Sequence, residues 1–211
     1  MASEPFNWNV IVAGAWNTAI LTPDGIRKRL FDLPDGTPIE VEVAIDRPGW
    51  FRVVHDGLLV TPSRQTLEIT PQTITASNLR RATQIAHKAL QDLPETPVAA
   101  VGINIRYRFS VFPDELIGLI RAPLDDVLAD DEYATEGSST RRSLTLTPGL
   151  INLEITQSDS NVVTLNFHRA STTPSDLREW LGRCDEFLEK AHKLFQTIRT
   201  DPNPKEATGE G

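Results

Sequence analysis

The residues of this chain best suited to chemistry are arginines, asparagines and a few other polar side chains that alternate with apolar residues. Asn104, Arg106 and Arg108 alternate with Ile103, Ile105 and Tyr107. Successive residues of a β-strand point to opposite faces, so these three polar side chains should share one face of a strand. Two later segments alternate in the same way. The candidate binding residues on the outer face of the predicted sheet are Asn104, Arg106, Arg108, Asn152, Glu154, Asn166 and His168.

Three functions are compatible with such a face. We favour a non-catalytic protein-interaction module, such as an adaptor, an immunity or inhibitor protein, or a regulatory subunit, because mixed charges and amides suit protein recognition better than phosphate tracking. The first alternative is an enzyme whose site is assembled from scattered residues near His168, Glu154 and Arg106. The second is nucleic-acid binding through Arg106 and Arg108, with help from other arginines of a continuous positive stripe, namely Arg80, Arg81, Arg141 and Arg142.

No local motif predicts catalysis, a metal or a cofactor. The four histidines are scattered, and neither His-x-x-x-His nor Cys-x-x-Cys occurs, so zinc has no support. Gly-x-Ser-x-Gly and the glycine-rich phosphate loops are also missing. Acidic residues in 125–131 lack the alternating spacing of a calcium loop. Cys184 lies on an apolar helical stripe, where burial makes a thiol inert.

Composition and charge narrow the class of partner. The 211 residues carry a formal net charge of −8, which disfavours nucleic acid. One cysteine excludes an intramolecular disulfide, residues 1–10 show no signal-peptide pattern, and no apolar run is long enough to span a membrane. We therefore expect a cytoplasmic protein that binds another protein or itself, not a membrane.

The elements that must position these residues are predicted to form an internally duplicated α+β unit. The helix start Thr-Ala-Ser-Asn-Leu-Arg at Thr75 resembles Thr-Pro-Ser-Asp-Leu-Arg at Thr173. The dipeptide Pro23-Asp24 likewise recurs as Pro113-Asp114, and the two repeats are separated by nearly the same number of residues. Each half is expected to contain a strand, a short helix, three to four antiparallel strands and a long helix. The two halves should form one curved antiparallel sheet with two long helices on one face.

The predicted boundaries follow from this arrangement. Residues 1–199 should form a single domain made of two pseudo-symmetric halves, about 7–95 and 96–199. Residues 124–142 are expected to be a flexible acidic loop and residues 200–211 a disordered tail. Ser77 or Asn78 should cap the first long helix, and the last helix should run unbroken from Leu177 to Ile198. Leu181, Cys184 and Leu188 on its apolar stripe should be buried.

Overall fold

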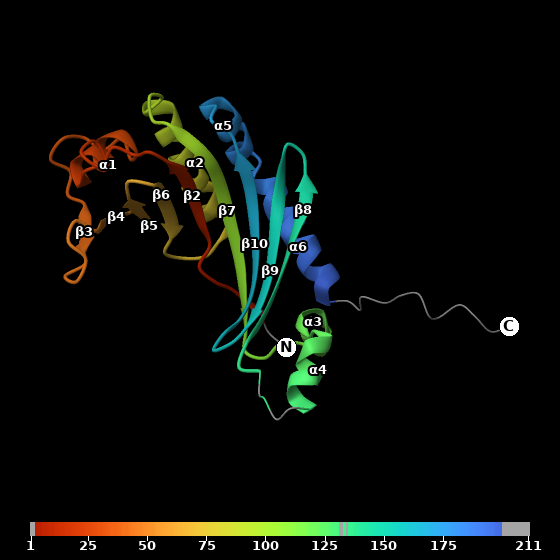
Figure 1. Cartoon of the computed structure of the whole chain (residues 1–211). Helices are drawn as coiled ribbons and strands as arrows, with labels where there is room; N and C mark the ends of the chain where they lie inside the picture. The colour runs from red at the N-terminus through yellow and green to blue at the C-terminus, as the bar shows by residue number, and fades with distance from the viewer. Residues whose placement is uncertain (1–2, 131–132, 134, 200–211) are drawn as a thin grey trace.

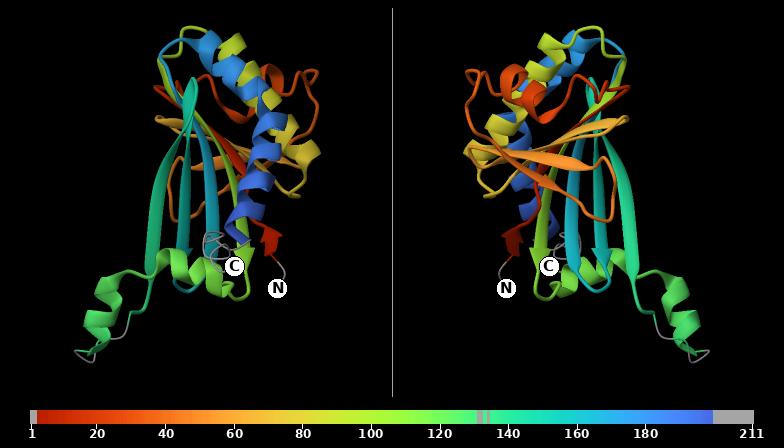
Figure 2. Two further views of the ribbon diagram at one scale, coloured as in Figure 1. Left: turned by 90° about the vertical axis from the view of Figure 1, so that its right-hand side faces the viewer. Right: turned by 90° about the vertical axis from the view of Figure 1, so that its left-hand side faces the viewer.

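The computed structural model describes residues 3–130, 133 and 135–199, and shows an α+β fold built on one open ten-stranded antiparallel sheet (Figure 1). Long helices cover one face of this sheet, and the opposite face is called the outer face below. Strands of the two halves cross steeply, as the two turned views in Figure 2 show. The predicted fold class is confirmed.

The first half begins with two strands, continues through a short helix and four strands, and ends in a long helix. Its elements are β1 (Ser3–Pro5), β2 (Asn9–Gly14), α1 (Pro23–Arg29), β3 (Glu40–Val43), β4 (Phe51–His55), β5 (Leu58–Pro62), β6 (Thr66–Pro71) and α2 (Ala76–Asp92). Thr22 and Thr75 cap α1 and α2 because their Oγ1 atoms accept from the backbone N–H of Gly25 and Asn78, both at 3.1 Å. The cap of α2 is thus Thr75, and not Ser77 or Asn78 as predicted.

The second half consists of one strand, two short helices, three strands and two further helices. Its elements are β7 (Val98–Phe109), α3 (Asp114–Ile120), α4 (Pro123–Asp130), β8 (Ser138–Leu146), β9 (Gly149–Gln157), β10 (Asn161–Ala170), α5 (Pro174–Gly182) and α6 (Cys184–Arg199). The predicted single last helix is broken at Arg183, which adopts φ −86° and ψ 15°. The break follows Gly182, the residue that gives a helix interior the least support apart from proline.

The segment 124–142, predicted to be a flexible loop, contains regular structure. Most of α4 and the first residues of β8 fall within it. Pro123 occupies the first position of α4, where its missing N–H costs nothing. The strand β8 begins at Ser138, inside the segment predicted to be a loop. Residues 131, 132 and 134 and the predicted tail 200–211 lie outside the described residues.

The strand order relates the two halves. The sheet runs β3-β4-β5-β6-β2-β7-β10-β9-β8, and β1 pairs with β7. In the first half β2 pairs with the last strand, β6, and in the second half β7 pairs with the last strand, β10. At the centre of the sheet, β2 and β7 pair with each other. Both Pro-Asp sites start the helix that follows one of these two strands. This agrees with the predicted duplication and the single domain, which themselves stay predictions.

One large cluster of buried apolar residues lies between the sheet and the helices and draws on both halves. It contains Val10 and Ile103 from the central strands and Leu79 and Trp180 from the helices. Leu181 and Cys184 are buried as predicted, whereas Leu188 is only partly buried. The inner face of the sheet is therefore committed to packing, and any binding chemistry of the strands is left to the outer face.

Candidate outer-face binding site

The outer face carries a hydrogen-bonded row of polar side chains that crosses six neighbouring strands. We call it the amide row, and from β8 to β6 it consists of Ser143, Asn152, Asn166, Asn104, Asn9 and Glu68. The first five residues are directly opposite one another in the strand register. Because side chains of paired residues lie on the same face, β-sheet register alone brings these groups into contact.

The amide row has a fixed direction. The Glu68 carboxylate can only accept, so Asn9 donates Nδ2 to it, over 2.5 Å. Asn104 then donates to Asn9 over 2.7 Å, and Asn166 donates to Asn104 over 2.8 Å. Asn152 donates to Asn166 over 3.2 Å. At the far end the hydroxyl of Ser143 donates to Asn152 over 2.9 Å.

Burial differs along the amide row. The side chains near its centre, Asn9 and Asn104, are 3% and 6% exposed, whereas Asn152 and Asn166 are half-buried. A primary amide has two N–H donors, and each row amide uses one of them within the row. The half-buried amides therefore keep a donor for a ligand, and the row holds them in place.

A hollow of about 490 Å³ lies over the β8 half of the amide row. Its lining is polar and consists of Asn104, Arg106, Arg141, Ser143, Asn152, Glu154, Thr164 and Asn166. Arg141, Glu154, Thr164 and Arg106 form a second cross-strand row beside the amides. Within it Arg141 donates to Glu154 over 3.0 Å. The hollow thus combines a neutral donor surface with one neutralised charge pair and one further arginine.

That further arginine, Arg106, is held in place without a carboxylate. Its Nη1 donates to the backbone oxygen of Asn7 over 2.6 Å and lies 3.5 Å from Asn9 Oδ1. Partial burial lowers the pKa of Arg106 from its ordinary value, and the carboxylates of Glu68 and Glu154 oppose that shift from a distance. A half-buried cation without an ion-paired carboxylate is unusual, because buried charges are normally paired.

Arg108 lies two residues further along the same face of β7. Its guanidinium is 3.6 Å from the centre of the Phe6 ring, a cation–π contact. Phe6 and Asn7 belong to the short connection between β1 and β2, so one segment positions both arginines. Asn7 has φ 46°, a left-handed conformation in which asparagine is enriched. No carboxylate of the described residues ion-pairs with Arg106 or Arg108.

The structure brings five of the seven predicted binding residues into the lining of the hollow. They are Asn104, Arg106, Asn152, Glu154 and Asn166. Arg108 and His168 share the outer face but lie beyond the hollow on opposite sides. His168 is opposite Gly102 and Leu150, one step past the amide row, and partial burial lowers its pKa.

Sequence reasoning missed Asn9 and Ser143. Neither residue belongs to a motif, and only the register between paired strands shows that they extend the amide row. Gly102 was also missed. A Cβ at this position would lie 2.7 Å from Asn166 Nδ2, so the glycine leaves the space in which the Asn166 amide reaches Asn104.

This arrangement gives little support to the two alternative functions, an enzyme and a nucleic-acid-binding protein. Glu154 is paired with Arg141, and about four residues of β10, roughly 13 Å, separate its row from His168. The arginines named for nucleic-acid binding do not form a continuous positive stripe, because Arg80 and Arg81 lie on α2 and pair with Asp185 and Asp56. Arg142 is opposite Leu153 on the inner face.

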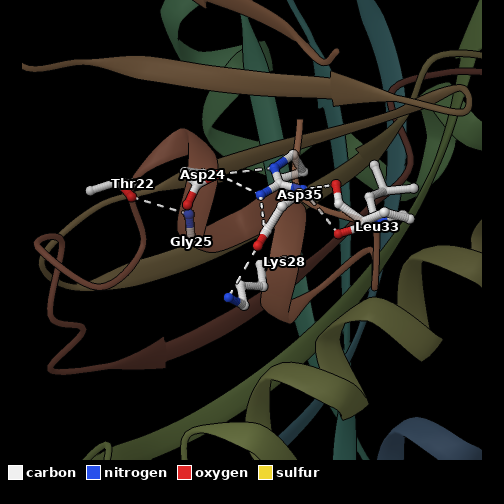
Figure 3. Close-up of polar contacts among 8 residues, drawn as sticks. Thr22, Asp24, Gly25, Lys28, Leu33 and Asp35 are labelled. Atoms are coloured by element: carbon white, nitrogen blue, oxygen red, sulfur yellow. Dashed lines mark hydrogen bonds and ion pairs between the residues drawn. The ribbon is translucent and has the colours of Figure 1, made fainter. Parts of the chain in front are cut away.

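A second polar cluster surrounds the buried side chain of Arg27 in α1 (Figure 3). Its Nη2 donates to Asp24 over 2.7 Å and to Asp35 over 3.0 Å, and its Nη1 donates to the backbone oxygens of Leu33 and Pro34. The hydrogen bond from Arg27 lowers the pKa of Asp35. Because this guanidinium binds the loop after α1 and has a partner at each nitrogen, we assign it a structural role.

Comparisons of the chain with protein-family models, with curated proteins and with solved structures found no match. Within the described residues, no helix is both long and apolar enough to cross a membrane. The same part of the chain contains no group of three or more histidine, cysteine, aspartate or glutamate side chains arranged to hold a metal ion.

Proposed function

We propose that the chain is a non-catalytic protein-interaction module that binds its partner through the outer face of the sheet. The observation that carries this proposal is the amide row together with Arg106, a set of hydrogen-bond donors held in place before any ligand arrives. Arginine is enriched at the centres of protein interfaces, and donors that are already ordered lose little entropy on binding. The adaptor, inhibitor and regulatory-subunit roles all remain within this proposal.

The arrangement of charges supports a protein partner over the alternatives. An enzyme of the kind considered above needs a pair of acid and base groups in contact, and Glu154 and His168 lie in different rows. Nucleic-acid binding needs a continuous run of cations along a backbone path. On the outer face, Glu154 and Glu68 interrupt the arginines, and the chain as a whole has a net charge of −8.

Site-specific photo-crosslinking in extracts of the native host tests the proposal. A photoreactive phenylalanine analogue replaces Thr164, which lines the hollow, and in the control it replaces the exposed Gln84 on α2. We expect a polypeptide adduct at position 164 only, formed equally after nuclease treatment. A nuclease-sensitive adduct, or equal adducts from both positions, would contradict the proposal.

A further inference from the structure

Arg106 and Arg108 on the outer face differ from most other arginines of the described residues because neither has a carboxylate within ion-pair distance. Arginines that do pair with a carboxylate are Arg27, Arg47, Arg52, Arg80, Arg81, Arg141, Arg169 and Arg183. Among the described residues, Arg106 donates hydrogen bonds only through Nη1, which leaves its Nε and Nη2 donors for a ligand. The guanidinium of Arg108 lies over the face of the Phe6 ring. This contact leaves the N–H groups at the edge of the guanidinium accessible.

Such a guanidinium is suited to an oxyanion. Its N–H donors form a planar fork that matches the two oxygens of a carboxylate, and ionised donor and acceptor make the stronger class of hydrogen bond. The segment Phe6–Asn9 has already ordered both side chains, so less entropy is lost on binding. A bound carboxylate would also supply the missing counter-charge of the half-buried Arg106.

The spacing of the two arginines indicates the shape of the ligand. Residues two apart on one face of a strand are about 6.6–6.8 Å apart. An extended peptide repeats the same distance between side chains at positions i and i+2. The next residue on this face of β7 is Asn104, and Asn166 is directly opposite it on β10, so the surface continues as neutral hydrogen-bonding groups after the two charges.

We propose that the outer face binds an acidic segment of a partner protein in extended conformation along β7, with carboxylates at positions i and i+2 on Arg106 and Arg108 and a neutral polar side chain next to Asn104. This inference rests on the proposed function and names the chemistry of its partner. Only two unpaired cations lie on the path, flanked by Glu4, Glu68 and Glu154. A peptide with neutral residues between its acids avoids the repulsion that these glutamates exert on a continuous polyanion.

Fluorescence polarisation with two synthetic peptides of equal charge tests the spacing. The alternating probe is fluorescein-labelled Thr-Thr-Glu-Thr-Glu-Thr-Thr, and the contiguous probe is Thr-Thr-Glu-Glu-Thr-Thr-Thr with the same label, so that only the first has carboxylates at positions i and i+2. We expect the alternating probe to bind at least about fivefold more tightly. Arg106→Ala and Arg108→Ala should each weaken it about tenfold, a typical loss for a central interface arginine. Arg80→Ala, which removes an already paired arginine of α2, should leave the affinity unchanged.

Other outcomes would overturn the inference. Equal binding of the two peptides would remove the spacing argument, and tighter binding of a labelled single-stranded oligothymidylate would assign the arginines to phosphates. Arg108→Ala keeps the test valid if Arg106→Ala proves unstable, because Arg108 makes a cation–π contact with Phe6, whereas Arg106 hydrogen-bonds to the backbone of Asn7. If the Thr164 adduct forms with a polypeptide but neither peptide binds, the acidic-segment inference fails and the proposed function stands. If neither the adduct nor peptide binding is seen, both fail.

Discussion

At the scale of single residues, the outer face depends on a few side chains whose partners are far away in the sequence. Alternation alone predicted which side of its strand Asn104 or Asn166 occupies. It did not predict that Asn9 continues the amide row or that Glu68 ends it, because these contacts require the register of β2 against β6 and β7. The requirement for glycine at position 102 arises from the same long-range contact.

Gly102→Ala should disturb the amide row without touching the apolar core. The new methyl group would push Asn166 away from Asn104, and we expect the free energy of unfolding to fall by about 1–3 kcal/mol. Gly118→Ala is the matched control, because a Cβ there meets nothing within 4 Å and alanine favours the helix α3. Urea denaturation measures the free energy of unfolding of both variants. Equal effects of the two substitutions would show that the row does not constrain position 102.

Cys184 provides a pH-dependent prediction. Burial raises the pKa of its thiol to about 11, whereas an unfolded thiol titrates near 8.5. A raised pKa means that the contribution of this thiol to stability is complete below about pH 8.5 and is lost as the pH approaches 11. We expect a thiol reagent at about pH 8 to label the native protein slowly and the urea-unfolded protein rapidly. Rapid labelling of the native protein would contradict the burial of Cys184.

At the scale of elements, apolar periodicity identified most of the helices and strands but not their interruptions. The buried residues on both sides of the break at Arg183 keep a spacing of three or four, such as Trp180, Cys184 and Phe187, so the apolar stripe gave no sign of the break. The stripe in residues 39–45 likewise predicted a strand but not its position. β3 is an edge of the sheet, so Val43 is 68% exposed. Ile45 lies in the turn after β3 and is fully exposed.

The helix α6 should contribute strongly to stability through Phe187. This ring is fully buried and lies 4.7 Å from the ring centres of both Phe167 and Trp180. Phe187→Ala should cost about 3–5 kcal/mol in urea denaturation, and Leu188→Ala, at a partly buried site, less than about 2 kcal/mol. A larger loss from Leu188→Ala than from Phe187→Ala would mean that α6 packs with a different face.

The edge strand β3 should be a site of aggregation. An unpaired edge with exposed apolar side chains is a template for pairing with another chain. Val43→Lys should slow aggregation on heating and change the free energy of unfolding by no more than about 0.5 kcal/mol. Gln84→Lys adds the same charge to α2 and separates the effect of the edge from that of net charge. If light scattering showed that both variants slow aggregation equally, β3 would not be the site of aggregation.

At the scale of the whole molecule, the two faces of the sheet have different tasks. The inner face packs against α2, α5 and α6, and the outer face displays the polar rows. β2 and β7 join the halves at the centre, so the amide row passes from one half into the other. A partner bound along β7 would therefore contact both halves of the protein.

The affinity of the crosslinked partner for paired double variants tests the central claim most directly. Arg106→Ala/Arg108→Ala should weaken binding roughly 30-fold or more, which corresponds to about 2 kcal/mol, with an unchanged melting temperature. Arg80→Ala/Arg81→Ala removes the same charge from α2, on the opposite side of the sheet, and should leave the affinity unchanged. Its melting temperature should also change little, since exposed ion pairs contribute little to stability. Equal affinities of the two double variants, or a loss of binding that only follows a lower melting temperature, would contradict the outer face as the binding surface.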